Sequence, residues 1–108
     1  DLRTQVGNFA KVLSGKAGRM LRAFIVAARS DPDVAAAFRS MWTNPRRTLA
    51  KSMLKRKQDQ GQLREDVDLD LVLDVLYGPL YYRFLVKNEP PSTKYAEAVV
   101  DVILRGLA

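Results

Sequence analysis

One segment constrains this chain more than any other: residues 71–86 read LVLDVLYGPLYYRFLV and are apolar almost throughout. At helical period, its apolar residues fall on two opposite sides of one helix. A water-exposed helix that is apolar on both sides needs a covering on both sides. A chain of 108 residues covers one side with its own core, so we expect a second copy of the chain to cover the other. The two sides are Leu73, Leu76, Tyr77, Leu80 and Phe84, and Leu71, Val75, Gly78, Tyr82 and Leu85.

Composition argues against several classes of function. The chain has no Cys, hence no disulfide framework or thiolate, and no His, the commonest general base and metal ligand. Asp74 and Arg83 interrupt an apolar segment that is already too short to span a membrane. No nucleotide-binding motif or signal peptide is visible. We therefore expect a cytoplasmic protein that is not an enzyme, with no catalytic residues, no cofactor and no membrane association.

The remaining segments also predict helices, and no strand pattern is present. A stripe from Leu2 to Leu13 predicts a first helix that ends at Gly15. A second helix is expected from Lys16 to about Arg29, and Asp31-Pro32 opens a short helix that reaches Trp42. The residues that the second helix is expected to bury are Met20, Leu21, Phe24, Ile25 and Ala28.

The second half of the chain has equally clear helix signals. Asn44-Pro45 is expected to cap a new helix, which Gly61 terminates. Asp68 caps the apolar helix, which Pro79 should bend. Ser92 or Thr93 starts a last helix up to Arg105, whose apolar stripe is Tyr95, Val99, Val102 and Ile103. The predicted fold class is all-α: one domain over residues 1–108, an antiparallel bundle of about five or six helices.

The net charge of +6 is unevenly distributed. Residues 1–57 carry thirteen Lys or Arg and three Asp or Glu, a net +10, and residues 58–108 carry five and nine, a net −4. The basic run has charges on one helix face but no interleaved aromatics, so a solvated face is favoured over a nucleic-acid reader. The acidic residues at 65–74 lack the central glycine and the closing glutamate of a calcium-binding loop. Acidic side chains are also common at a helix N-terminus, where the helix dipole stabilises them, so we expect no metal site. The two runs are Arg46, Arg47, Lys51, Lys55, Arg56 and Lys57, and Glu65, Asp66, Asp68, Asp70 and Asp74.

Aromatic and methionine side chains at core spacing are the candidates for a small-molecule binding site. Either they form a filled core, or they form a core with a partly open apolar cavity, in which tyrosine hydroxyls act as polar handles. The sequence leaves both interpretations open. The residues are Phe9, Met20, Phe24, Met41, Trp42, Met53, Tyr77, Tyr81 and Phe84.

Four short motifs add a family resemblance: PRR at 45–47, GQLRED at 61–66, YGPLYYRFLV at 77–86 and ILRGL at 103–107. With them, nearly the whole chain resembles the C-terminal regulatory domain of tetracycline-repressor (TetR/AcrR) type transcription regulators. The resemblance implies a domain that dimerises through its last two long helices as a four-helix bundle. It also implies a ligand cavity between the preceding helices and the inner side of the 69–87 helix. A helix-turn-helix domain should precede Asp1, so DNA is read only through that missing domain.

The resulting prediction is the effector-binding and dimerisation domain of a repressor, whose small apolar or amphipathic inducer alters DNA binding by the full-length protein. Two alternatives stay open: a purely structural dimerisation domain without ligand, and a basic module that binds nucleic acid or an acidic partner. The expected pocket is lined by Phe24, Trp42, Met53, Tyr77, Leu80, Tyr81 and Phe84. The expected homodimer interface is Val75, Gly78, Tyr82, Leu85, Tyr95, Val99, Val102 and Ile103.

Overall fold

A computed structural model describes residues 1–108 as six α-helices and two π-helical turns, η1 and η2. The predicted all-α class and the predicted number of helices are confirmed. None of the helices combines the length and the apolar character that a membrane-spanning segment needs. The elements are α1 Leu2–Ser14, α2 Lys16–Ala28, α3 Pro32–Phe38, η1 Arg39–Thr43, α4 Asn44–Asp59, α5 Leu69–Tyr81, η2 Tyr82–Val86 and α6 Thr93–Leu107.

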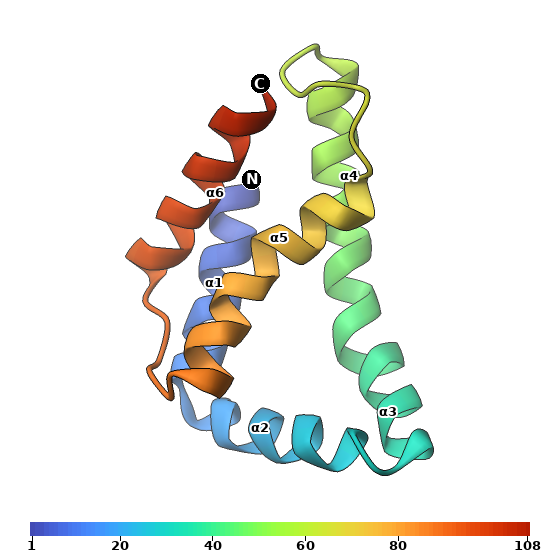
Figure 1. Ribbon diagram of the computed structural model, residues 1–108, viewed down its shortest axis with the longest axis vertical. Helices are drawn as coiled ribbons and strands as arrows, with labels where there is room; N and C mark the ends of the chain where they lie inside the picture. Colours follow the sequence, from blue (N-terminus) through green and yellow to red (C-terminus); the bar gives the residue numbers. More distant parts are fainter.

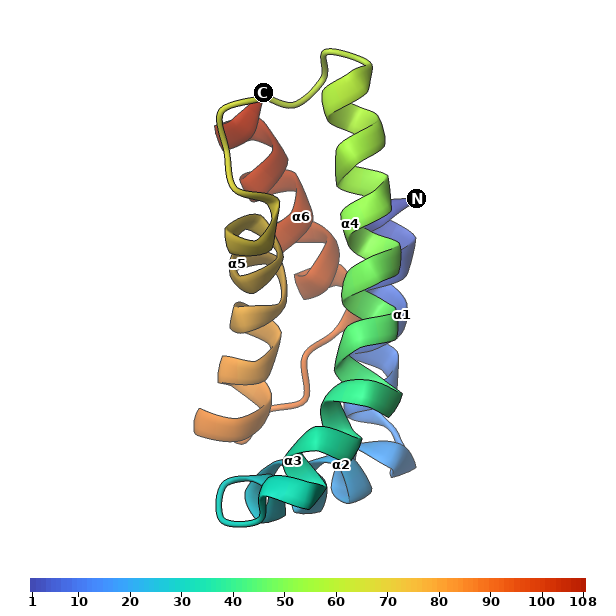
Figure 2. The ribbon, with the colours of Figure 1, turned by 90° about the vertical axis from the view of Figure 1, so that its right-hand side faces the viewer.

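Helix α1 lies at the centre of the arrangement and packs against α2, α4, α5 and α6. In Figure 1, α6 runs beside α1 at the left, α4 stands at the right, and α2 crosses the lower end. Figure 2 shows α4 and α5 side by side, with α1 and α6 behind them. The main core therefore lies between α1, α4, α5 and α6, where Val6, Leu54, Leu76 and Val100 have no exposed surface.

Three of the predicted helix boundaries are confirmed. The Asp68 carboxylate accepts the Asp70 N–H at 2.9 Å at the start of α5, and the Ser92 hydroxyl accepts the Tyr95 N–H at 3.0 Å at the start of α6. Gly61 adopts φ 74° just after α4, a backbone conformation that glycine tolerates and that stops a helix. The axis of α5, which contains Pro79, changes direction partway along (Figure 1).

The predicted helix break at Asn44-Pro45 is wrong. Asn44 has helical dihedral angles, φ −65° and ψ −43°, and its N–H donates to the carbonyl of Arg39, five residues earlier. This wider π-helical turn accommodates Pro45, which has no N–H to donate. Segments α3, η1 and α4 therefore run on as one continuous helical stretch, with Trp42 in its π-helical turn.

The expected burial of α2 is only partly correct. Leu21 is buried, but Met20 and Phe24 are 65% and 46% exposed. Because α2 crosses the end of the bundle, no second layer of helices covers its far side (Figure 1). The stripe of α6 is also shifted: Ala96 and Val100 are its buried residues, whereas Val102 is 67% exposed.

Candidate functional site

An aromatic pocket of about 40 Å³ lies where α1, the η1–α4 stretch and α5 meet. Four aromatic side chains form its walls, and three polar side chains from the η1–α4 stretch lie at its edge. We call this site the aromatic pocket. Its lining residues are Phe9, Trp42, Thr43, Arg46, Arg47, Tyr77 and Tyr81.

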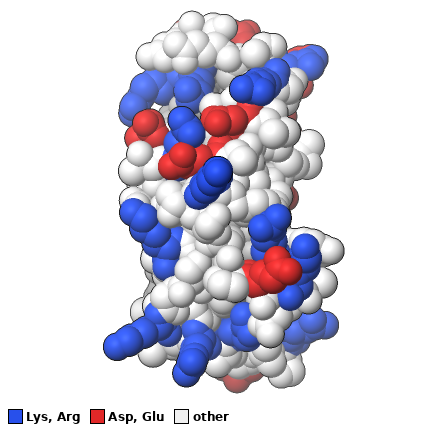
Figure 3. Space-filling view, turned by 90° about the vertical axis from the view of Figure 1, so that its left-hand side faces the viewer, with Lys and Arg blue, Asp and Glu red and all other residues white.

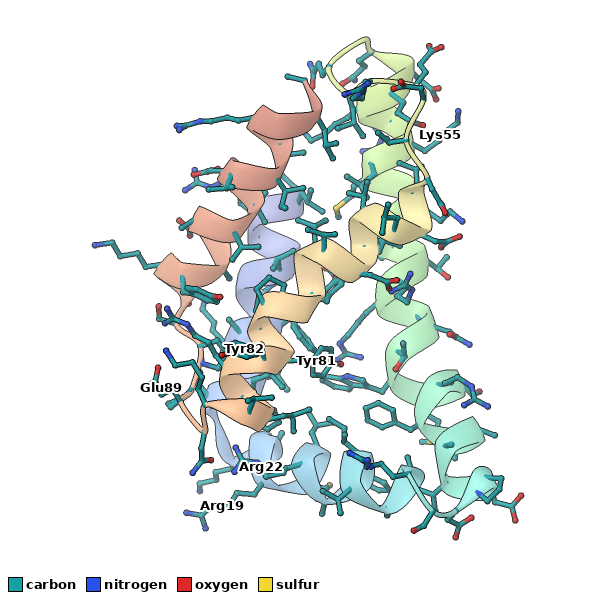
Figure 4. The ribbon with its side chains drawn as sticks, in the orientation of Figure 1. Arg19, Arg22, Lys55, Tyr81, Tyr82 and Glu89 are labelled. Carbon is teal, nitrogen blue, oxygen red and sulfur yellow. The ribbon has the colours of Figure 1, made fainter.

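The aromatic rings of the pocket pack around Phe9. The centre of the Phe9 ring is 5.1 Å from Tyr77 and 5.3 Å from Tyr81, both edge to face, and 5.8 Å from Trp42. The Trp42 indole N–H donates to the Tyr81 hydroxyl at 3.3 Å. In Figure 4, Tyr81 extends from α5 toward α4, and Tyr82 lies on the other side of α5. Phe9 and Tyr81 thus hold Trp42 in the wall of the pocket.

The hydroxyl of Tyr77 is the one polar group of this pocket that is buried without a partner. Tyr77 is only 6% exposed, and no protein group lies at hydrogen-bonding geometry with its hydroxyl. Burial raises the pKa of Tyr77, although the neighbouring Gln5 amide and Arg46 act in the opposite direction. Burial raises the pKa of Tyr81 as well. Both hydroxyls therefore remain protonated at neutral pH and retain a proton to donate.

Two arginines give the pocket its charge, but only one is neutralised. The Arg47 guanidinium donates to the Asp74 carboxylate at 2.7 Å and to the Asp70 carbonyl at 3.1 Å. The Arg46 guanidinium lies 3.2 Å from the centre of the Trp42 ring and donates to the Trp42 carbonyl at 3.2 Å. Partial burial lowers the pKa of Arg46, which still stays charged. No carboxylate pairs with Arg46 among the ion pairs of the chain.

The seven residues predicted to line one pocket do not do so. Trp42, Tyr77 and Tyr81 line the aromatic pocket, but Phe24 lines a separate apolar hollow of about 210 Å³ between α2 and the α3–η1 stretch. We call this second site the outer hollow. Phe84 lies in a third hollow, where the Arg22 guanidinium of α2 is 4.6 Å from the centre of its ring (Figure 4).

The two remaining residues lie away from the aromatic pocket. Leu80 has no exposed surface, and Met53 packs against the buried core. Helical stripes predict which side of a helix faces inward, but the crossings between helices determine which stripes share one space.

Sequence reasoning missed four of the lining residues. The sequence offers Phe9 as an aromatic candidate but the expected pocket leaves it out, and the sequence places the two arginines on a solvated basic face. The signal that was available is the spacing of Trp42 and Arg46, because residues four apart lie on the same side of a helix. The missed residues are Phe9, Thr43, Arg46 and Arg47.

The two sides of α5 are as predicted. All five inner residues are buried, and the outer side of the helix is exposed, with Leu71 at 59%, Val75 at 41% and Tyr82 at 54%. Between α5 and α6, an apolar groove of about 240 Å³ is lined by residues that include Val75, Val102 and Ile103. Figure 3 views the molecule from the side of α6 and shows uncharged surface near its centre, between charged side chains at both edges.

The other residues of the predicted interface lie near this groove or on the same helices. Gly78, Leu85 and Val102 are exposed, and Val99 and Ile103 are partly buried. Tyr95 is also partly buried, because the Arg83 guanidinium lies 3.7 Å from the centre of its ring. We call the exposed apolar side of α5 and α6 the outer face.

The basic and acidic runs are not two independent solvated surfaces. Lys51 pairs with Asp70 at 3.1 Å and Arg47 with Asp74 at 2.7 Å, and both pairs join α4 to α5. Asp68 caps α5, and Asp66 accepts two bonds from Arg64, at 2.7 and 2.9 Å. These contacts use part of the basic run within the chain, so less of it is available to a nucleic acid.

Comparison with known proteins gives consistent matches. The family profile described as "Tetracyclin repressor-like, C-terminal domain" matches residues 1–103. The HTH-type transcriptional regulator YdeS of Bacillus subtilis is 30% identical over 107 residues, which are 99% of this chain and 54% of that protein. The HTH-type transcriptional regulator Rv1556 of Mycobacterium tuberculosis is 24% identical over 90 residues, 83% of this chain and 45% of that protein.

A solved structure agrees with these sequence matches. The crystal structure of the TetR family transcription regulator SCO0332 superposes with a TM-score of 0.85 at 34% sequence identity, over 100% of this chain and 60% of that one. The chain spans about half the length of the curated relatives it matches.

Proposed function

The chain belongs to the family of tetracycline-repressor-like C-terminal domains, and from this membership we propose that it binds a small-molecule effector and forms a homodimer. The observation that carries the proposal is the aromatic pocket, which combines apolar walls with a buried Tyr77 hydroxyl that has no protein partner at hydrogen-bonding geometry and that the nearby Gln5 amide stabilises only in part. Buried polar groups are nearly always hydrogen-bonded, and those that are not call for an explanation. A bound ligand that accepts a hydrogen bond from the Tyr77 hydroxyl would explain why this group has no protein partner.

The volume of the aromatic pocket indicates how a ligand enters. About 40 Å³ suits one or two water molecules, whereas an apolar cavity of about 150 Å³ binds benzene. The outer hollow of about 210 Å³ lies on the other side of Trp42, which lines both spaces. Displacement of the Trp42 side chain would join the two into one site. Such a site approaches the lower end of the range of about 300–1,000 Å³ that is usual for ligand pockets.

We further propose that the outer face forms the homodimer interface. Exposed Leu71 and Val75 line one apolar groove with Val102 and Ile103, and exposed Tyr82 lies further along the outer side of the same helical segment. Exposed apolar surface of this kind favours association. Two copies related by a two-fold axis would each present α5 and α6, which makes a four-helix bundle.

The regulatory mechanism follows from these two sites. An effector that displaces Trp42 would move the η1–α4 stretch relative to α1 and α5. Because α5 also carries part of the outer face, this movement would reach the dimer interface. Because an effector favours the arrangement to which it binds more tightly, it shifts the equilibrium between two forms of the dimer. In a full-length cytoplasmic repressor, this shift would change the spacing of two helix-turn-helix domains that precede the segment described here.

Sedimentation of a Gly78→Arg variant tests the dimer. A Cβ at Gly78 meets nothing within 4 Å in the single chain, so the substitution leaves the fold of the protomer intact. We expect a dimer for the wild type at micromolar concentration and a folded monomer for the variant, because a close helix crossing excludes the charged side chain. Ser52→Arg, on the exposed surface of α4, is the matched control and should remain dimeric. A monomeric wild type would contradict the proposed interface.

Ligand screening tests the pocket. Trp42 is the only tryptophan of the chain, so its fluorescence reports on the pocket directly. We expect members of a panel of small aromatic compounds, charged and uncharged, to raise the melting temperature and to change Trp42 emission in the same concentration range. If no compound of the panel, charged or uncharged, changes either signal, the effector-binding role is refuted and a dimerisation domain remains.

A further inference from the structure

We propose that the effector is a flat aromatic molecule with an anionic group, and that the anionic group binds the Arg46 guanidinium. This inference rests on the proposed function and specifies the class of ligand for the aromatic pocket. It is carried by the charge of the lining, the direction of its hydrogen-bonding groups and the position of Arg46 against Trp42.

The charge at the pocket is positive and uncompensated. Arg47 is neutralised by Asp74, whereas Arg46 has no carboxylate partner and uses its guanidinium for one bond to a backbone carbonyl. No Asp or Glu lines the pocket. Because the site is partly shielded from water, an anion there gains more from Arg46 than it would from an exposed arginine.

The polar groups of the pocket are mainly hydrogen-bond donors. Arg46 is a donor only, and the Tyr77 hydroxyl has an unused proton. The Tyr81 hydroxyl accepts from the Trp42 indole, so its own proton is also free to be donated. An oxyanion accepts several such bonds at once, whereas a cation or a molecule rich in N–H groups would meet mostly donors.

Displacement of Trp42 connects ligand entry to the charge of Arg46. The Arg46 guanidinium now lies 3.2 Å from the centre of the Trp42 ring, a cation–π arrangement. When Trp42 moves to admit a ligand, Arg46 loses this partner. An aromatic anion replaces both groups at once, because its ring takes the place of the indole and its charge satisfies the guanidinium.

Matched pairs of probes test the proposal: benzoate against benzamide, and 2-naphthoate against 2-naphthamide. Each pair has the same ring and nearly the same shape and differs in the negative charge. Isothermal titration calorimetry on the 108-residue chain gives the affinities, and Trp42 fluorescence confirms the site. We expect at least one carboxylate to bind about tenfold or more tighter than its amide, the ratio that one charge-assisted hydrogen bond supports.

Two variants distinguish Arg46 from the general positive charge of the chain. Arg46→Gln keeps a polar side chain without the charge, and we expect it to reduce the carboxylate preference to within about threefold, since the charge-assisted bond is lost. Arg56→Gln lies on the same helix, is exposed and does not line the pocket, so it should keep the wild-type preference. Circular dichroism melts serve as the control for folding, and we expect both variants to unfold cooperatively like the wild type.

Three outcomes would overturn the proposal. If the amides bind as tightly as the carboxylates, the effector role stands and the anionic class is wrong. If Arg56→Gln lowers the preference as much as Arg46→Gln, the attraction is a diffuse effect of net charge. If neither member of either pair binds, the anionic class is refuted, and the screen of uncharged compounds decides separately whether the pocket binds a ligand at all.

Discussion

Replacing Tyr77 with phenylalanine should stabilise the protein, contrary to the usual effect of a substitution at a buried position. The hydroxyl of this residue has no partner at hydrogen-bonding geometry, and the residue is 6% exposed. Leaving a polar group buried without a partner costs about 1–3 kcal/mol. Because the Gln5 amide lies nearby and eases part of this cost, we expect Tyr77→Phe to recover about 1 kcal/mol, the low end of that range.

Tyr81→Phe is the matched control, since it removes the same hydroxyl one helical turn later. That hydroxyl accepts the Trp42 indole N–H at 3.3 Å, so its removal breaks a bond and leaves a partly buried donor unpaired. We expect a loss of about 0.5–1.5 kcal/mol for this variant. The two variants should therefore differ in sign, by about 2 kcal/mol in total.

Urea unfolding at one fixed protein concentration measures both variants, because the stability of a dimer depends on concentration. A gain of about 1 kcal/mol corresponds to an increase of about 4 °C or more in the melting temperature of a domain of this size. If Tyr77→Phe destabilises the chain as much as Tyr81→Phe, the Tyr77 hydroxyl is bonded in solution. The argument that it awaits a ligand acceptor would then be refuted.

Two further substitutions test the fold. Both are made in the Gly78→Arg background, which the proposed interface predicts to be monomeric: Leu76→Ala, on the inner side of α5, should cost about 2–5 kcal/mol in urea unfolding, whereas Leu71→Ala, 59% exposed on the outer side, should cost less than about 0.5 kcal/mol. Equal losses would contradict the orientation of α5. The hydrogen bonds from Arg64 lower the pKa of Asp66, so this carboxylate stabilises the fold above the ordinary carboxyl pKa, and the contribution disappears as the pH falls through its folded-state pKa. Carboxyl NMR titration should show the pKa of Asp66 returning to its ordinary range in Arg64→Gln, and an unchanged value would mean that the pair does not persist in solution.

The sequence by itself determined the features that depend on near neighbours. Asp68 and Ser92 cap their helices, and Gly61 stops α4, because these roles require only a few adjacent residues. The sequence also predicted that α5 has two apolar sides, since the helical period alone places Leu76 and Leu71 on opposite sides.

Only the tertiary structure decided which of these surfaces meet. Phe24 and Trp42 both lie on apolar stripes, but α2 crosses the end of the bundle, so Phe24 reaches the outer hollow instead of the aromatic pocket. The π-helical turn at η1 removed the expected break before Pro45 and carried Arg46 from the expected solvated face to the edge of the pocket. Helical periodicity specifies the inward side of each helix, whereas the angles and positions at which helices cross depend on the packing of distant side chains.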